Sequence, residues 1–233
     1  MPEISDSNSF AKVLPSAMQR YAPALLQAGQ QYGVSPWLLA GVLWRETNAG
    51  TVLTPPGAAG TGDWTPRHAG SRYFAFANPV TGMPPDGLGW GRGLMQLDYG
   101  AEHAWVTTHD WADPLVNIGY AALKLAGLVV YFGGRPGVAV LVDQWRLTGY
   151  PTAHVAGWLE KYGLASTGPY PDPRPLQGAV LDEAALSAYN AGIAGVLQAA
   201  AAGLPPSAPT AHNDYGSWIL EHISAWKAAL PRV

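Results

Sequence analysis

Apolar residues recur at helical spacing in the first part of the chain. Residues 16–31 place their apolar side chains along one side of a helix, and a glycine then breaks the pattern. The pair Ser35 and Pro36 restarts it, because serine suits the N-cap and proline fits the first helical turn. The run that follows, residues 37–44, is apolar nearly all round, which is typical of a buried helix. This helix is expected to end near residues 48–50.

The middle of the chain lacks such a pattern. Residues 51–90 are rich in Gly and Pro and predict a long irregular loop, and such loops inside compact domains are usually functional. Residues 91–98 predict a short Gly-rich strand or turn. Later patterns predict helices over residues 117–132, 138–146, 153–162, 181–190, 192–202 and 214–230, with a Pro-rich loop at 170–175. No internal repeat or clear second domain is visible, so we expect a single domain over residues 1–233.

The composition is that of a folded domain with few charges. Hydrophobic residues make up 48% and charged residues 12%, whereas a disordered chain would be more charged and less apolar. The net charge of −3 is scattered, which argues against a nucleic-acid partner. The chain has no cysteine, which excludes disulfides and thiol chemistry. His68, His103 and His109 are scattered without a ligand-like pattern, so neither a metal nor a cofactor is expected.

Three further expectations follow from composition and local pattern. No unbroken apolar run of about eighteen residues occurs, so neither a transmembrane helix nor membrane insertion is expected. Residues 1–10 are polar and acidic, so no secretory signal is expected there. The ten Trp and eleven Tyr residues either pack in the core or stack against sugar rings, and composition does not separate these alternatives.

Glu46 is the most informative residue for chemistry. It lies near the C-terminal end of the almost wholly apolar helix. Burial and the negative end of the helix dipole both favour the protonated carboxyl group, which makes Glu46 a candidate general acid. The alternative is an ordinary glutamate at a helix end that pairs with Arg45 or faces water.

The segment at residues 91–98, Gly-Arg-Gly-Leu-Met-Gln-Leu-Asp, is the second candidate. Its glycines permit tight turning and a close approach of backbone to ligand. Leu94 and Leu97 can anchor the segment, while Gln96 and Asp98 present polar groups. The alternative is a Gly-rich hairpin in which the aspartate only forms a turn.

The third candidate is the segment at residues 187–192, Ser-Ala-Tyr-Asn-Ala-Gly. Tyr189 and Asn190 stand just before a helix-breaking glycine, where they would suit the edge of a cleft. The alternative is a plain helix C-terminus that Gly192 ends.

In this order, the three segments resemble the lysozyme-like superfamily, which includes goose-type lysozymes and soluble lytic transglycosylases. The similar stretches are residues 32–39, 45–50, 93–96 and 188–192. The resemblance covers roughly residues 20–226, with unmatched insertions at about 54–88 and 133–178. It implies a mainly α, lysozyme-like α+β fold: a helical bundle with a small Gly-rich β-hairpin region that lines a cleft.

Within that superfamily the chain is more similar to the goose-type branch. Those enzymes follow the Gly-Leu-Met-Gln signature with a hydrophobic residue and an aspartate, as Leu97 and Asp98 do here. They also place an aspartate shortly before the signature, where this chain has Asp86. Because the loop at 54–88 is longer than the family's, Asp63 is a rival for the role of Asp86.

Two more features bear on this resemblance. The late Asn-Asp-Tyr stretch that ends at Tyr215 resembles one before the family's final helix, which implies that Tyr215 lies in the cleft. The family's usual Glu-Ser at the acid is Glu46 and Thr47 here, a mild departure.

The resemblance implies scission of the β-1,4 bond between N-acetylmuramic acid and N-acetylglucosamine in peptidoglycan. Glu46 would protonate the glycosidic oxygen, and Asp98 and Asp86 would activate water in an inverting muramidase. It also implies a set of substrate-binding residues: Trp90, Met95, Gln96, Tyr189, Asn190 and Tyr215. We further expect the loop at 54–88 to lie over or beside the cleft.

Two alternatives remain open. A lytic transglycosylase needs no second carboxylate, because the muramic C6 hydroxyl attacks and gives a 1,6-anhydro product; the presence of Asp98 favours hydrolysis. A non-catalytic peptidoglycan-binding or phage-tail structural module is the other, and the presence of Glu46 argues against it. In each case the partner is the peptidoglycan of the cell wall, with delivery by phage lysis, a phage tail or a secretion apparatus.

Overall fold

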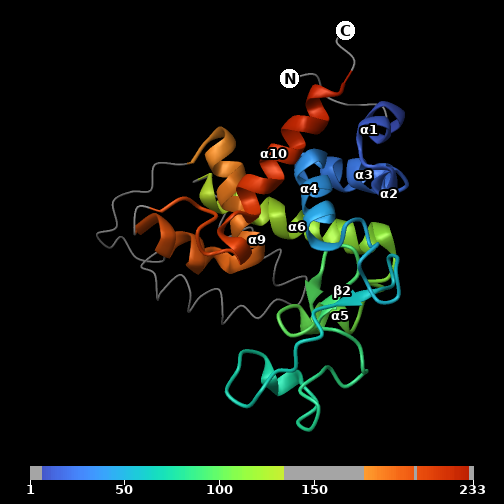
Figure 1. Cartoon of the computed structure of the whole chain (residues 1–233), viewed down its shortest axis with the longest axis vertical. Helices are drawn as coiled ribbons and strands as arrows, with labels where there is room; N and C mark the ends of the chain where they lie inside the picture. Colours follow the sequence, from blue (N-terminus) through green and yellow to red (C-terminus); the bar gives the residue numbers. More distant parts are fainter. Residues whose placement is uncertain (1–6, 134–175, 202–203, 231–233) are drawn as a thin grey trace. The chain divides into compact units, whose positions relative to one another are not determined.

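The structure, a computed structural model, describes residues 7–133, 176–201 and 204–230 (Figure 1). Two compact units are distinguished: unit 1 holds residues 1–122 and 226–233, and unit 2 holds residues 123–225. The described residues form eight α-helices and one small antiparallel sheet, so the expected mainly α class with a little β structure is confirmed. The helices predicted at 138–146 and 153–162 and the loop at 170–175 lie outside the described residues.

The first helices of unit 1 are short and packed through their apolar sides. They are α1 (Ser7–Val13), α2 (Ser16–Gln19) and α3 (Ala22–Tyr32). The single helix expected at 16–31 is therefore wrong, because Pro23 has no N–H to continue the α2 hydrogen bonds and instead occupies the first turn of α3. The sequence pattern also missed α1, whose fully buried Phe10 meets Trp37 edge-on at 4.9 Å between ring centroids.

Helix α4 (Pro36–Thr47) is the central helix of the candidate site. Every residue from Trp37 to Leu43 is buried, which confirms the prediction of a helix that is apolar all round. The helix ends where predicted, as Asn48, Ala49 and Gly50 all have left-handed φ values of 48°, 56° and 85°. This tight reversal stops the helix directly after Glu46 and Thr47.

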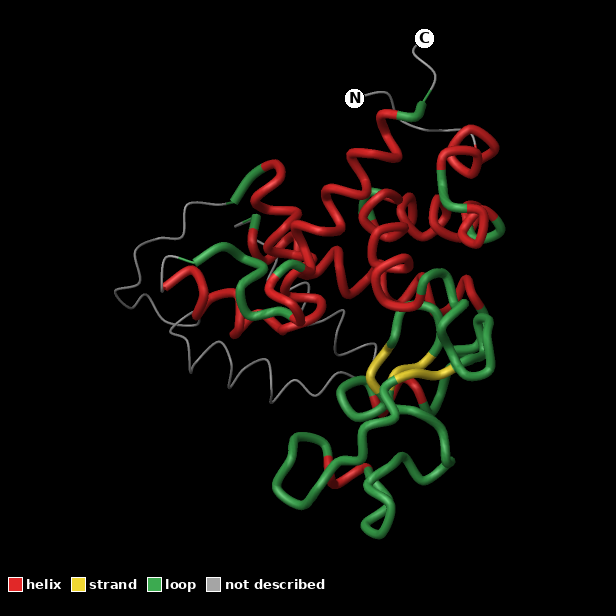
Figure 2. The backbone as a smooth tube through the Cα atoms, viewed as in Figure 1, coloured by secondary structure: helices red, strands yellow, loops and turns green. Residues whose placement is uncertain are grey.

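The sheet consists of three strands of two residues each: β1 (Thr61–Gly62), β2 (Gly91–Arg92) and β3 (Leu97–Asp98). They pair in the order β1-β2-β3, with Thr61 opposite Arg92 and Gly91 opposite Asp98. The hairpin expected at 91–98 is confirmed, whereas β1 was not predicted. Figure 2 shows the strands in yellow and the surrounding loops in green.

The chain between β1 and β2 is irregular, as predicted, apart from one 3-10 turn, η1 (Phe74–Phe76). In Figure 1 this loop is the cyan and teal stretch that extends past the sheet, away from α1 to α4. After β3 the chain enters α5 (His103–Val106), which was not predicted, and then α6 (Pro114–Phe132), which was.

The remaining described helices follow the sequence pattern closely. Helix α9 spans Gly178–Ala201, and its backbone departs from helical geometry at Gly192 (φ 77°, ψ 160°), which confirms the predicted split at a glycine. A 3-10 turn, η2 (Ala211–Asn213), precedes α10 (Tyr215–Ala228).

Helix α6 is the described element that bears on the expectation about membranes. No unbroken apolar run marks it in the sequence, yet it is the one described helix whose length and average composition would allow it to cross a membrane. Of its most apolar window, 56% is buried inside the structure, and a core helix passes the same test of length and composition.

Tyr131, near the end of α6, provides a test of the packing of unit 2. Its buried hydroxyl has no hydrogen-bond partner in the described part of the chain, and burial raises the pKa of Tyr131 to about 12. We expect Tyr131→Phe to leave the free energy of unfolding near pH 7 unchanged or to raise it by about 1 kcal/mol, because an unpaired buried hydroxyl is costly.

The pH dependence should also change. The folded pKa lies above the ordinary value of 10.0, so this group's contribution is complete below about pH 10 and is lost as pH rises through about 12. Tyr131→Phe should therefore lose less stability than the parent between these pH values in urea titrations. A variant that is clearly less stable near pH 7 would mean that the hydroxyl is bonded in the folded protein.

Candidate functional site

Thr47 joins the end of α4 to the hairpin. Its fully buried hydroxyl donates a hydrogen bond to the Leu94 carbonyl at 2.8 Å and accepts one from the Gly50 amide at 3.0 Å. The hydroxyl also lies 3.2 Å from the Leu43 carbonyl in its own helix. This contact joins the last turn of α4, which also carries Glu46, to the segment with the Gly-Leu-Met-Gln motif.

Asn117 of α6 holds the same hairpin from a second direction. Its side-chain oxygen accepts a hydrogen bond from the Met95 amide at 2.9 Å, and its side-chain nitrogen donates to the Arg92 carbonyl at 3.2 Å. Gly93 has a φ of 65° and lies against this side chain, where any Cβ would collide with the Asn117 amide. The turn of the hairpin is therefore fixed by two buried polar side chains, neither of which was predicted as a site residue.

Gln96 is half-buried and lies across the sheet. Its side-chain nitrogen donates to the Gly93 carbonyl at 3.0 Å, and its backbone has a left-handed φ of 47°. Its side-chain oxygen occupies the space that a Cβ would need at either Gly62 or Gly91, which face each other on β1 and β2. The predicted substrate-binding residue Gln96 thus retains an accessible surface beside the hairpin.

Met95 and Trp90 do not fit their predicted role. Both side chains are fully buried, so neither presents a surface on which a sugar could bind. The physical reason is that large apolar side chains next to a tight hairpin provide the core on which it packs. The prediction of these two residues as substrate contacts is corrected accordingly.

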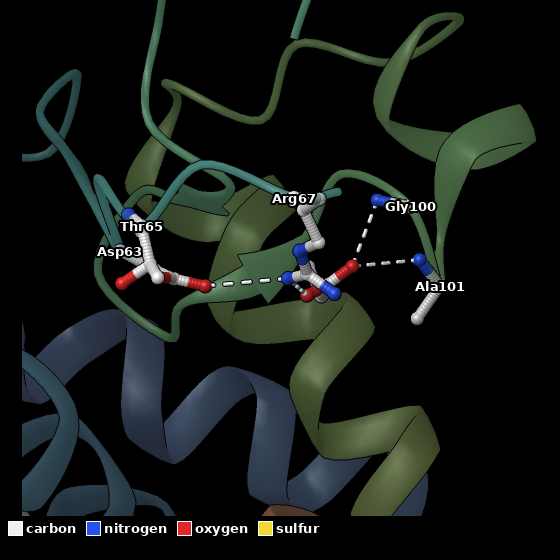
Figure 3. Close-up of polar contacts among 6 residues, drawn as sticks. Asp63, Thr65, Arg67, Gly100 and Ala101 are labelled. Atoms are coloured by element: carbon white, nitrogen blue, oxygen red, sulfur yellow. Dashed lines mark hydrogen bonds and ion pairs between the residues drawn. The ribbon is translucent and has the colours of Figure 1, made fainter. Parts of the chain in front are cut away.

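Asp98 is brought together with Asp63 by a single arginine from the long loop. Arg67 Nη2 lies 2.8 Å from Asp98 Oδ2 and 3.2 Å from Asp63 Oδ2 (Figure 3). The other oxygen of Asp98 accepts hydrogen bonds from the Gly100 and Ala101 amides, each at 2.8 Å. Asp98 is therefore held by three short contacts.

Asp63 is held less firmly. Its Oδ1 accepts from the Thr65 amide at 3.3 Å, and its side chain is 42% exposed, compared with 32% for Asp98. Its backbone has a left-handed φ of 48° directly after β1. This left-handed conformation orients the carboxylate toward Arg67, and nothing in the sequence except the aspartate itself predicted it.

Asp86 makes a separate ion pair. Its Oδ1 lies 3.0 Å from Nη2 of Arg92, whose side chain is fully buried. The guanidinium of Arg92 also lies over the rings of Tyr99 and Trp111, at 4.7 and 5.5 Å from their centroids. Burial, followed by the charge of Asp86, raises the pKa of Tyr99, while Arg92 acts in the opposite direction.

Two carboxylates, Asp63 and Asp98, therefore share one cation, and Asp86 is bonded elsewhere. Of the two candidates, Asp63 and not Asp86 shares a cation with Asp98. Glu46 is half-buried in the last turn of α4, and all four acids belong to unit 1. These acids lie on α4, on β3 and in the loop between β1 and β2.

The predicted site residues of the C-terminal half belong to unit 2. Tyr189 is buried, with Lys124 Nζ 4.6 Å from its ring centroid, and Tyr215 is almost completely buried. Neither has the open aromatic face that a sugar contact requires, so their prediction as substrate-binding residues is not supported. Asn190 is exposed and accepts a hydrogen bond from the Ala211 amide at 3.3 Å.

Comparison with known proteins leaves the family open. No protein-family model and no curated protein matches this chain. Among the described residues, no group of three or more His, Cys, Asp or Glu side chains has the arrangement of a metal site.

The Thr47 connection can be tested by removing its hydroxyl. Thr47→Val keeps the shape but leaves the buried Leu94 carbonyl without its donor, whereas the Gly50 amide keeps the Thr47 backbone carbonyl at 2.9 Å. We therefore expect the free energy of unfolding to fall by about 1–3 kcal/mol. Thr47→Ser is the matched control, because it keeps the hydroxyl and loses only a methyl group, at about 1 kcal/mol or less. Urea denaturation measures both; a valine variant as stable as the serine variant would show that the hydrogen bonds do not hold the hairpin.

Proposed function

We propose that this protein cleaves the β-1,4 bond between N-acetylmuramic acid and N-acetylglucosamine in peptidoglycan, with Glu46 as the general acid. The observation that carries the proposal is the hydrogen bond from Thr47 to Leu94, which couples the Glu46 end of α4 to the Gly-Leu-Met-Gln hairpin. Glu46 is half-buried in the last turn of a helix whose preceding residues, from Trp37 to Leu43, are all buried and apolar, and such surroundings favour a carboxyl group that donates a proton.

The pair formed by Asp63 and Asp98 supports inverting hydrolysis as the first mechanism. An inverting glycosidase needs a carboxylate that activates water on the face of the sugar opposite the acid. Asp63 is the more open member of the pair, and its two contacts of 3.2 and 3.3 Å leave it capacity to accept a further hydrogen bond from water. In this mechanism Asp98 holds Arg67 and so orients Asp63. Asp86 is bonded to Arg92 and has only an indirect effect on the reaction.

One observation favours lytic transglycosylation as a second candidate. Asp98, the aspartate expected to activate water, already accepts three short hydrogen bonds, which leaves little capacity for a nucleophilic water. In a transglycosylase the muramic C6 hydroxyl attacks instead, Glu46 acts first as acid and then as base, and Asp98 has only to shape the turn after β3. The reaction products distinguish the two mechanisms.

The general acid is tested by Glu46→Gln. The amide is nearly isosteric but cannot donate an acidic proton, so we expect clearing of a peptidoglycan suspension to slow by on the order of a hundredfold or more while the fold is kept. Glu221→Gln, an exposed substitution on α10, is the control and should clear like the parent protein. A Glu46→Gln variant that retains about a tenth of the parent rate would remove Glu46 from this role.

The second carboxylate is tested by three matched Asp→Asn variants and by mass spectrometry of the products. For inverting hydrolysis we expect reducing muramic ends, a loss on the order of a hundredfold in Asp63→Asn and Asp98→Asn, and a smaller loss in Asp86→Asn. Mainly 1,6-anhydromuramic ends, together with an active Asp98→Asn variant, would assign transglycosylation. Binding to peptidoglycan without any cleavage would instead support a non-catalytic module.

A further inference from the structure

Arg67 belongs to the long loop between β1 and β2, yet several contacts fix it on the hairpin region. Its backbone amide donates to the Gly82 carbonyl at 2.8 Å, which ties two distant parts of the loop together. Its guanidinium lies 4.4 Å from the ring centroid of the buried Trp90, just before β2. Its Nη2 reaches Asp98 at the end of β3, so one side chain links the loop, the residue before β2 and the end of β3.

Figure 3 shows the guanidinium of Arg67 between Asp63 and the backbone of Gly100 and Ala101. Because both carboxylates contact the same nitrogen, the contacting oxygens of Asp63 and Asp98 lie no more than about 6 Å apart. Two like charges at that separation repel each other unless a cation lies between them. The side chain of Arg67 is only 19% exposed, so water screens this arrangement less than it would an open surface pair.

A second contact holds the loop at the same place. Tyr73 packs directly against Gly100, where any Cβ would collide with the Tyr73 side chain. Gly100 is also one of the two residues whose amides bind Asp98, so the loop meets the hairpin on both sides of that carboxylate.

We propose that Arg67 is a positioning residue, which holds the carboxylates of Asp63 and Asp98 together and closes the long loop on the hairpin. Its effect on the loop follows from the contacts alone, whereas its effect on the reaction rests on the proposed function. The Asp98 carboxylate is the fixed end of this bridge, because it makes three short contacts. The Asp63 carboxylate is the more weakly held end, and Arg67 keeps it in position.

The experiment compares Arg67→Met, Arg67→Lys and Arg72→Met. Arg67→Met removes the charge but keeps an unbranched side chain, and Arg67→Lys keeps one charge without the planar guanidinium. Arg72→Met is the matched control, because Arg72 lies in the same loop and stacks on Tyr73 at 4.6 Å but forms no ion pair in the part of the chain that the structure describes. Amide hydrogen exchange reports on loop residues 66–83, and steady-state kinetics separates kcat from KM.

We expect Arg67→Met to speed exchange in this segment by about tenfold and to lower kcat by on the order of tenfold to a hundredfold, with KM changed far less. Arg67→Lys should recover part of both losses, and Arg72→Met should show neither. Unchanged exchange in Arg67→Met would overturn the proposal outright. Faster exchange with an unchanged kcat would overturn the positioning role and leave Arg67 as a loop anchor.

The proposed function can fail separately. If the parent protein does not cleave peptidoglycan, the proposed function fails, but hydrogen exchange still decides whether Arg67 closes the loop. If the parent cleaves and Arg67→Met behaves like Arg72→Met in both measurements, the proposal about Arg67 fails while the proposed function stands.

Discussion

The hydrogen bond from the Thr47 hydroxyl to the Leu94 carbonyl is the contact on which the candidate site depends. It joins residues 47 positions apart in the sequence and lies entirely inside unit 1. A buried carbonyl without a partner is costly, so this one contact makes the end of α4 and the turn of the hairpin favour a single arrangement. Asn117 holds the other side of the same turn, and the hairpin therefore has little freedom to move away from Glu46.

Local rules predicted the elements that are defined by their own sequence. Helix α4 and helix α6 follow from apolar periodicity, and the bend in α9 follows from Gly192. The hairpin at 91–98 follows from its glycines. The prediction was wrong over residues 16–31, where the effect of Pro23 outweighed a continuous helical pattern.

Contacts between residues far apart in the sequence could not be predicted from local patterns. Strand β1 has only two residues and exists because β2 pairs with it. In the bridge from Asp63 through Arg67 to Asp98, Arg67 and Asp98 are 31 positions apart across an irregular loop, and no periodic pattern predicts such a contact. Burial of the aromatic residues was equally hard to predict. Trp90, Tyr189 and Tyr215 lie in or next to the motifs and are buried, whereas Trp64 in the loop is 45% exposed.

The position of Gln96 over Gly62 and Gly91 has a consequence for sequence variation. The two glycines are far apart in the chain but face each other in the sheet, and the same amide oxygen excludes a side chain from both. Residues 62, 91 and 96 therefore form one steric unit, in which a larger residue at either glycine requires a smaller one at position 96. Among proteins that share this hairpin, these three positions should vary together, and two glycines paired with a glutamine would mark a loop insertion of any length between the first two strands.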